Sequence, residues 1–437
     1  MEQYANMKKS GVPWADMIPD TWNVRRGKTI LKLLNRPVKT DDEVITCFRD
    51  GEVTLRKNRR EDGYTVSLQE TGYQGIEPGD LVVHGMDGFA GSIGISDSRG
   101  KATPVLNVMD SAQNKKYLMY YLRALAYKDV FMSLSTGIRV RSCDLRWNKL
   151  ATLPFVVPSI EEQNGIVEYL DRKLQQIDSI LADARQSIEE YGLWRKAILF
   201  ETVTKGLDSN VKYKDSGIDW IGKIPEQWHL VKITRLLDYN HPYPVGDGDH
   251  GLIKPADYTD EGIPYIRVQN LGWGTEITLD NVVYITEEKN EKIASSTLRP
   301  KDILFAKTGG TIGKTGIIPD EVPIANTTSH VGKITLDARY NPKFVLYVLS
   351  SQVGYNQFWE VASKKTTRPE LSIDEIRAIK VIMPETREEQ DRIVEYLDNK
   401  ISEIDDMIQE KQRVIADLEL FKKSLVYETV TGKRKVV

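Results

Sequence analysis

The stretch that comes nearest to a ligand-binding motif is TGGTIGKT, at Thr308–Thr315. A phosphate-binding loop needs glycine at the first position of its signature, five residues before the second glycine, so that the backbone can cradle phosphate oxygens. Threonine stands at position 308 instead, and no clear second acidic element follows. The sequence therefore favours a glycine-rich hairpin turn in a β-rich domain. An enzyme that uses this turn to bind a nucleotide is the alternative.

Other signatures of bond-making chemistry are missing from the sequence. It has no HExxH, CxxC or Gly-x-Ser-x-Gly, and it lacks both the Asn/Asp-Pro-Pro-aromatic tetrad and the glycine-rich cofactor loop of a methyltransferase. The five histidines are scattered, and the two cysteines, Cys47 and Cys143, match no metal spacing. We therefore expect a chain that recognises a ligand and carries no catalytic residue, metal or cofactor of its own.

Recognition could rest on polar and basic side chains in loops. Arginine can form two hydrogen bonds to guanine, asparagine or glutamine can do so to adenine, and lysine can contact phosphate. Any one such residue is more often an ordinary surface residue than a DNA contact, but loops at equivalent places in both halves of the chain are polar and basic. The candidates are His84, Met86, Asp87, Thr136, Arg139 and Arg141 in the first half, and Arg267, Gln269, Asn270, Lys307, Thr308, Gly310, Thr311, Lys364, Lys365, Thr366 and Arg368 in the second.

Two copies of one long segment are expected to position these loops. Residues Glu161–Thr204 recur without a gap as Glu388–Thr431. Apolar residues from Leu170 to Tyr191 alternate in steps of four and three, which is the heptad pattern of a coiled coil, and only Lys411 interrupts the pattern in the second copy. At about 1.5 Å per residue, each helix would be roughly 60 Å long. We predict two helices that pack together in antiparallel fashion; two ordinary helices on separate cores are the alternative.

A second repeat opens each half. Ser10–Trp22 (SGVPWADMIPDTW) recurs as Ser216–Trp228 (SGIDWIGKIPEQW), and each copy is followed by a body that shares its layout, but little identity, with the other body. The opening segment and the long segment together form a repeated frame around each body. Such a frame around two divergent bodies indicates an internal duplication. We predict an α+β fold in which two mixed α/β domains are separated by two long helices that form an antiparallel coiled coil, with an internal pseudo-two-fold repeat.

Shorter elements and boundaries follow from local patterns. Strands are expected at Gly79–Val83, Gly91–Ile95, Pro264–Val268 and Lys301–Phe305, and helices at Tyr117–Tyr127 and near Pro342–Val353. The expected domains are residues 1–157 and 218–383, the repeated helices residues 158–207 and 384–433, and the linker between the halves residues 208–217.

The composition limits the class of protein. A net charge of −3 over 437 residues gives no global basic field, so nucleic-acid binding would need local patches or a partner. The first residues contain no apolar core of a signal peptide, and no run approaches about 18 apolar residues. With its few cysteines, the chain is expected to be reduced and cytoplasmic.

On these features the chain resembles the specificity subunit of a type I restriction–modification system over essentially its whole length. The segments that carry the resemblance are Ile224–Trp228 (IPEQW), Gly79–Val82 (GDLV), the loop before each long helix, and Pro-x-x-x-Glu-Gln at Pro158–Gln163, which has one more residue at Pro384–Gln390. Each motif alone is weak, but their order recurs twice. The first body departs from the pattern, because it lacks a clear counterpart of Arg267–Asn270 (RVQN).

The resemblance implies that each domain reads one half of a split DNA sequence. It also implies that the paired helices fix the gap and dock two methylation subunits, and that restriction subunits can join the complex. No catalytic residue is implied in this chain; S-adenosylmethionine is expected on the methylation subunits, and ATP and magnesium on the restriction subunit. The alternative is a non-catalytic coiled-coil scaffold whose two β-rich domains bind proteins or sugars.

Overall fold

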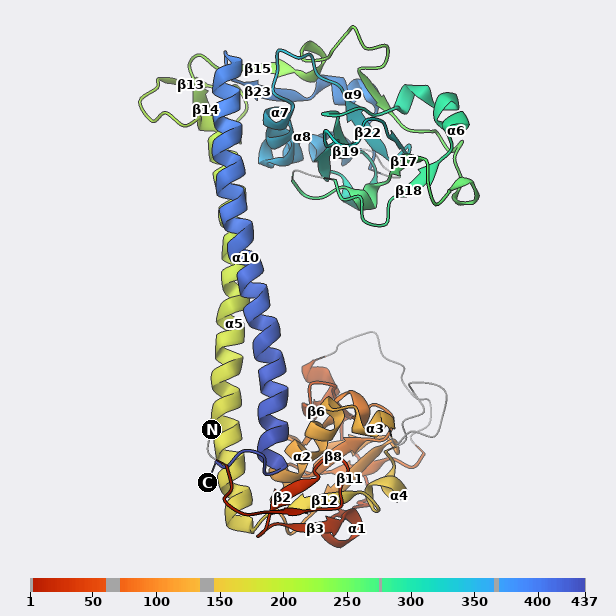
Figure 1. Cartoon of the computed structure of the whole chain (residues 1–437), viewed down its shortest axis with the longest axis vertical. Helices are drawn as coiled ribbons and strands as arrows, with labels where there is room; N and C mark the ends of the chain where they lie inside the picture. Colours follow the sequence, from red (N-terminus) through yellow and green to blue (C-terminus); the bar gives the residue numbers. More distant parts are fainter. Residues whose placement is uncertain (1–2, 60–70, 134–144, 275–276, 365–368, 437) are drawn as a thin grey trace. The chain divides into compact units, whose positions relative to one another are not determined.

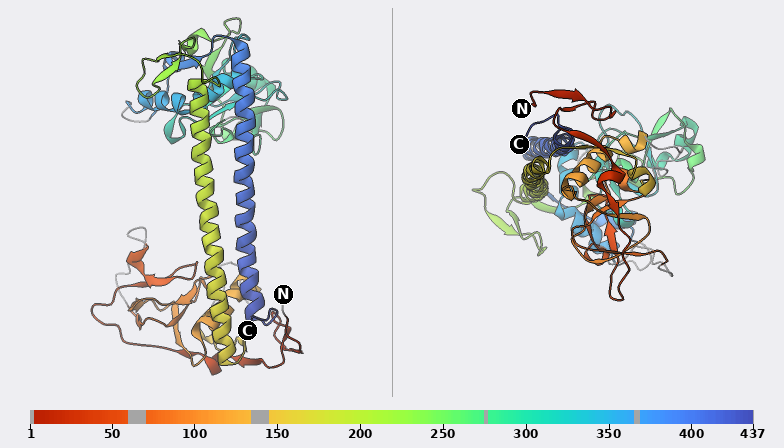
Figure 2. Two further views of the ribbon diagram at one scale, coloured as in Figure 1. Left: turned by 90° about the vertical axis from the view of Figure 1, so that its left-hand side faces the viewer. Right: turned by 90° about the horizontal axis from the view of Figure 1, so that it is seen from below.

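A computed structural model of the chain describes residues 3–59, 71–133, 145–274, 277–364 and 369–436. The chain forms two compact units: the first comprises Met1–Arg185 and Gln412–Val437, and the second comprises Gln186–Lys411 (Figures 1 and 2). The long helices α5 (Ile160–Lys205) and α10 (Arg387–Val430) each contribute residues to both units. None of the helices in the described ranges is long and apolar enough to cross a membrane.

The two long helices run antiparallel in the first unit. Asp178 of α5 pairs with Lys422 of α10, and Arg185, one heptad further along α5, pairs with the earlier Glu419 at 2.8 Å. The predicted apolar seam is buried at Leu170, Leu174, Ile177, Leu181 and Ala184, and Leu425, Val426 and Val430 of α10 are buried in the same core as the first four. Burial of this stripe is the main source of helix stability, because isolated helices in water are marginal.

The second unit repeats this arrangement with the other ends of the helices. Leu397, Ile401 and Ile404 of α10 are buried, as are Leu199 and Val203 of α5. Arg195 of α5 pairs with Asp405 of α10, with 3.3 Å between Nε and Oδ1. The prediction of paired antiparallel helices is therefore confirmed within each unit.

The domain of the first unit is built on a four-stranded antiparallel sheet. Its strand order is β4 (Lys32–Leu33), β11 (Leu106–Asp110), β8 (Leu81–His84), β9 (Ile93–Ile95). Helix α2 (Lys115–Tyr127) packs on β8 and β9 and buries Tyr117 and Tyr121. A strand pair, β3 (Asn23–Arg26) with β12 (Pro154–Val157), leads into α5. The other elements are β1 (Met7–Lys9), β2 (Met17–Pro19), α1 (Gly27–Ile30), β5 (Ile45–Cys47), β6 (Val53–Leu55), η1 (Arg56–Asn58), β7 (Gln74–Ile76), η2 (Gly88–Ala90), β10 (Gly100–Ala102), α3 (Val130–Ser133) and α4 (Trp147–Leu150).

The domain of the second unit has the same central order. Its antiparallel sheet is β16 (Val245–Asp247), β22 (Val331–Ile334), β19 (Ile303–Ala306), β20 (Thr315–Ile317), with α7 (Pro342–Ser350) packed on β20. The pair β15 (His229–Lys232) with β23 (Lys380–Met383) leads into α10. The other elements are β13 (Tyr213–Asp215), β14 (Lys223–Pro225), η4 (Ile233–Arg235), η5 (Pro255–Asp257), β17 (Ile263–Ile266), η6 (Val268–Asn270), β18 (Val283–Ile285), α6 (Glu287–Lys292), η7 (Ala294–Ser296), η8 (Gly309–Thr311), β21 (Asn326–Thr327), α8 (Gln352–Ala362) and α9 (Ile373–Ala378). The predicted duplicated α+β fold is confirmed.

Two local expectations differ from the structure. The helix expected near Pro342–Val353 is two helices, because Ser351 is extended (ψ 176°) and its hydroxyl caps α8 by accepting from the Val353 N–H. The expected linker, residues 208–217, contains β13, which pairs with β14. This hairpin, like β1–β2 in the first unit, is short and partly exposed, so its strands lack an apolar pattern that a sequence could reveal.

Candidate nucleic-acid interface

The predicted glycine-rich turn is confirmed as the connection between antiparallel strands β19 and β20. A phosphate-binding loop would be followed by a long helix whose N-terminus faces the phosphate, whereas here strand β20 follows after one short 3₁₀ turn, η8. An added Cβ at Gly309 or Gly310 would meet no atom of the described residues within 4 Å, and Gly309 has a φ of +68°. Among the described residues, the crest of the turn, with Gly310 and the half-buried Thr311, is therefore open to a ligand that approaches the backbone.

Lys307 lies at the base of this turn as part of an ion-pair network. Its Nζ is 2.7 Å from Oδ2 of Asp247 and 2.9 Å from Oε1 of Glu370, and its side chain is only 7% exposed. Burial by itself would lower the pKa of Lys307, but the bonds to the two carboxylates outweigh burial and raise it. Lys307 is therefore charged, and its charge is balanced by two acidic groups of the same unit.

The neighbouring Thr308 is also buried. Its hydroxyl lies 3.1 Å from Nδ1 of His330, and its carbonyl accepts from the Thr311 hydroxyl. The N–H of Gly309 donates to the carbonyl of Pro369, and that of Leu371 to the carbonyl of Lys307. The end of the loop that follows α8 is thus bonded to the turn. Lys364 begins this loop and is exposed, whereas Lys365, Thr366 and Arg368 lie outside the described residues.

In the segment Arg267–Asn270, some side chains bond to the backbone of the same domain and others are exposed. Asn270 is 1% exposed; its Oδ1 accepts from the Arg267 N–H at 3.0 Å, and its Nδ2 donates to the Thr278 carbonyl at 3.0 Å. Arg267 Nη2 donates to the carbonyl of Asn281 at 2.9 Å. Gln269 is exposed, and it is the residue of this segment best placed to meet a base edge.

A turn of the first unit corresponds to the glycine-rich turn of the second. Residues 79–95 align with 301–317 without a gap, and both turns end on a glycine in the left-handed region, Gly91 (φ +99°) and Gly313 (φ +98°). In the first unit, Nδ1 of His84 accepts from the N–H groups of Met86 and Asp87, at 3.2 and 2.9 Å. Burial lowers the pKa of His84 and Arg49 lowers it further, while Asp87 opposes both, so His84 holds the turn as a neutral acceptor.

The first unit brings His84, Met86 and Asp87 together on this one turn, with Met86 exposed at its surface. Asp87 also accepts from Arg49 Nη2 at 3.1 Å. Thr136, Arg139 and Arg141 lie outside the described residues. The contribution of the basic loop to this surface therefore stays a prediction.

Several residues at these turns carry no local sequence signal. Trp273 is 56% exposed, and its backbone forms an isolated β-bridge with Thr315. A Cβ added to Gly313 would lie 3.5 Å from the Trp273 ring. Asp247, His330 and Glu370 reach the glycine-rich turn from distant segments of the chain. A flat aromatic side chain beside an open turn could stack on a base, but only the folded chain shows that Trp273 lies there.

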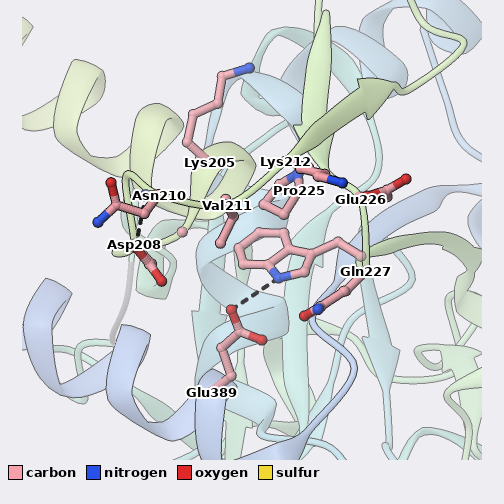
Figure 3. Close-up of a pocket in the computed structure, with 11 residues that line it drawn as sticks. Lys205, Asp208, Asn210, Val211, Lys212, Pro225, Glu226, Gln227 and Glu389 are labelled. Atoms are coloured by element: carbon pink, nitrogen blue, oxygen red, sulfur yellow. Dashed lines mark hydrogen bonds between the residues drawn. The ribbon is translucent and has the colours of Figure 1, made fainter.

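Figure 3 shows a pocket of ≈ 270 Å³ in the second unit, where the linker, the β13–β14 hairpin and α10 meet. Trp228 lines this pocket, and its indole Nε1 donates to Oε1 of Glu389 at 3.0 Å. In the first unit the equivalent Glu162 accepts from the Tyr4 hydroxyl at 2.6 Å, and Tyr4 packs edge-on against Trp22 with ring centroids 5.7 Å apart. The pocket therefore lies where the opening segment of the unit contacts the start of its long helix. No group of three or more metal-ligating side chains occurs among the described residues.

The family model described as "Type I restriction modification DNA specificity domain" matches residues 228–416. The EcoBI type I restriction enzyme specificity subunit of Escherichia coli is 26% identical over 373 residues, which cover 82% of this chain and 74% of that protein. The chain is therefore similar to type I restriction enzyme specificity subunits over most of its length. The MjaVIII specificity subunit of Methanocaldococcus jannaschii is 24% identical over 345 residues, which cover 77% of this chain and 76% of that subunit.

Solved structures share the fold of this chain. A chain from a structure of the assembly and conformational transition of the type I R-M system matches with a TM-score of 0.71 at 14% identity, and the match covers 94% of this chain and 98% of that chain. The HsdS subunit from Thermoanaerobacter tengcongensis matches with a TM-score of 0.54 at 15% identity, over 95% and 98% of the two chains. The predicted family resemblance is confirmed.

Proposed function

We propose that this chain is the sequence-recognition subunit of a type I restriction–modification complex, and that each unit reads one half of a bipartite, gapped DNA target. The observation that supports this most is the combination of one frame with two different turns. Both units have the same sheet order, helix and opening hairpin, yet the aligned turn residues are His84–Asp87 (HGMD) in the first and Ala306–Gly309 (AKTG) in the second.

This combination suits DNA recognition, because a common scaffold can present different donors and acceptors to different bases. The exposed residues Met86 and Gln269 and the crest around Gly310 and Thr311 are the proposed contacts, together with the basic loops that follow in each domain. Lys307, Thr308, Asn270 and His84 shape the turns from beneath. Phosphate neutralisation must come largely from partners, because the chain carries a net charge of −3.

The partners in this proposal are two methylation subunits that carry S-adenosylmethionine, and restriction subunits that carry ATP and magnesium. The long helices offer matching apolar sites for the methylation subunits. Leu193 and Trp194 of α5 are 65% and 44% exposed, and their repeat counterparts on α10, Leu420 and Phe421, are 64% and 45% exposed. Large apolar side chains exposed on otherwise polar helices are typical of interaction sites, and their occurrence at repeated positions suits two copies of one partner.

Methylome sequencing tests this function. The gene would be expressed with its methylation partner in a host that lacks other methyltransferases, and the methylated motif would be read from the genome. We expect a motif of two short specific parts separated by a non-specific gap. A scaffold for protein or sugar ligands would give no such motif, and the purified chain would show no salt-dependent DNA binding even with the methylation subunit added.

A further inference from the structure

In the first unit, the domain is fastened to α5 by the Gln of the repeated EEQ segment. Gln163 is fully buried, and its Oε1 accepts from the N–H of Asn114, the N-cap of α2, at 3.0 Å. Its Nε2 donates to Oε1 of Gln113 at 2.7 Å and to the carbonyl of Pro158 at 3.0 Å. The Asn114 side chain in turn caps α2 by accepting from two backbone N–H groups. One buried amide therefore joins the start of α2 to the start of α5.

A second fastening lies two helical turns further along α5. Oδ1 of Asp171, from the repeated IVEYLD segment, accepts from the Tyr120 hydroxyl at 2.6 Å, and Oδ2 pairs with Lys116 Nζ at 2.8 Å. Both partners lie on α2, and Tyr120 is buried. Two separate contacts along one helix fix its position and its rotation on the other, whereas a single contact would leave it free to pivot.

The second unit contains the same contacts at positions 227 residues later. Gln390, which is 2% exposed, accepts from the N–H of Asn341, the N-cap of α7, at 2.9 Å. Asp398 accepts from the Tyr347 hydroxyl and pairs with Lys343 Nζ at 2.8 Å. The asparagine, lysine and tyrosine partners therefore recur with the glutamine and aspartate that they contact.

The two domain helices have otherwise diverged. Residues Asn114–Leu122 (NKKYLMYYL) and Asn341–Leu349 (NPKFVLYVL) share four residues: the asparagine, the lysine, the tyrosine and the final leucine. The first three are the residues that bond to the long helix. If packing alone constrained these helices, their shared residues would be apolar. Three of the four shared residues are instead the polar ones that bond to the long helix.

From this recurrence we infer that these residues form a latch in each unit: Asn114, Lys116, Tyr120, Gln163 and Asp171 in the first, and Asn341, Lys343, Tyr347, Gln390 and Asp398 in the second. The latch holds each domain at one position on its long helix. Given the proposed function, on which this inference rests, the latch residues are positioning residues that determine the length of the gap between the half-sites. They do not determine which bases are recognised.

The two latches differ in their additional contacts, which in the first include the bonds from Gln163 Nε2 to Gln113 and Pro158. Asp391 accepts from Asn341 Nδ2 and also from Arg387 Nε at 2.7 Å, so a charged pair reinforces the second latch. Asn164 takes this place in the first unit and accepts from Asn114 Nδ2 at 2.8 Å. The Arg387–Asp391 pair lies within α10, so both latches should loosen when equivalent residues are changed.

The test uses the complex of the full chain with its methylation subunits and DNA duplexes that carry both half-sites. The gap has its native length, or is one base pair shorter or longer. The measured quantity is the methylation rate on DNA with the native gap divided by the rate on DNA with an altered gap. Asp171→Asn, alone or combined with Gln163→Leu, should lower this ratio at least fivefold, because the domain samples a wider range of positions. Asp398→Asn should lower it as well. Discrimination against a substituted base within each half-site should stay as in the wild type.

Glu168→Gln and Glu395→Gln are the matched controls, since they remove an exposed carboxylate at equivalent positions of the same helices; they should leave the ratio unchanged. Circular dichroism identifies variants that remain folded. If the double variant does not fold, the ratio measured for Asp171→Asn alone tests the inference. An unchanged ratio in a folded latch variant, or altered base discrimination, would overturn the inference. The wild-type complex is the separate check on the proposed function, because it must itself prefer one gap length.

Discussion

At the scale of single residues, we expect His84 to make the turn at residues 84–91 sensitive to pH. Its folded-state pKa lies below the ordinary 6.5, with burial as the first cause. The unfolded chain therefore takes up a proton first, so the stability that depends on neutral His84 is complete above about pH 6.5 and is lost as the pH falls below it. Denaturant unfolding of the chain from pH 5 to 8 should show this loss, and His84→Gln, which keeps an acceptor that does not titrate, should reduce it. An equal loss in the variant would contradict the assigned role of His84.

Lys307 and Lys364 should behave differently, although both were predicted to contact DNA. Lys307→Ala leaves the largely buried Asp247 without its lysine partner and should cost about 3–5 kcal/mol of unfolding free energy. Lys364, whose side chain is 70% exposed, should affect stability little. Lys364→Ala should instead reduce the slope of log affinity against log salt by about 1, if the side chain meets a phosphate. Denaturant titration and DNA binding at several salt concentrations measure the two effects; loss of DNA affinity without loss of stability in Lys307→Ala would contradict the supporting role.

Residue types alone could not separate reading residues from supporting ones. Asparagine suits both an adenine contact and a backbone cap, and only the fold shows that Asn270 bonds to Arg267 and Thr278. The same holds for Lys307, whose acidic partners are distant in the chain. The sequence did locate the turns correctly, since glycines with positive φ and flanking apolar strands leave a local pattern.

At the scale of elements, the long helices were predictable because their buried stripe repeats with the period of the coiled coil. The break at Ser351 was not, because a serine cap and a serine inside a helix give the same sequence pattern. The strand at Tyr213–Asp215 was missed because its pairing with Lys223–Pro225 depends on backbone hydrogen bonds and not on an apolar face.

The exposed apolar pairs give a prediction at the same scale. Changing Leu193 and Trp194, or Leu420 and Phe421, to serine should weaken binding of a methylation subunit at least tenfold, because large apolar side chains at interface centres carry much of the affinity. The free chain should keep its stability, since these side chains are exposed. Ile180→Ser is the control: Ile180 is exposed on α5, but its counterpart Met407 is half-buried, so the site is not repeated. Calorimetric titration with the methylation subunit measures the change, and equal affinities for all variants would reject these pairs as docking sites.

At the scale of the whole molecule, the duplicated frame was visible in the sequence because helix and hairpin recur at constant offsets. The frame leads to a prediction about the gap. Inserting seven residues after Arg185 and seven before Gln412 keeps the heptad seam in register and lengthens each helix by about 10 Å, or about three base pairs of duplex. The methylated motif should keep both half-sites and change its gap. A motif with an unchanged gap would contradict a role of the helices in spacing.

The central claim is that each unit reads one half-site independently of the other. Its most direct test is to replace residues 23–155 by the corresponding body of another specificity subunit and to sequence the methylome of a host that carries the hybrid with the methylation subunit. We predict that one half-site changes, while the other half-site and the gap persist. A change in both half-sites, or in neither, would contradict the claim.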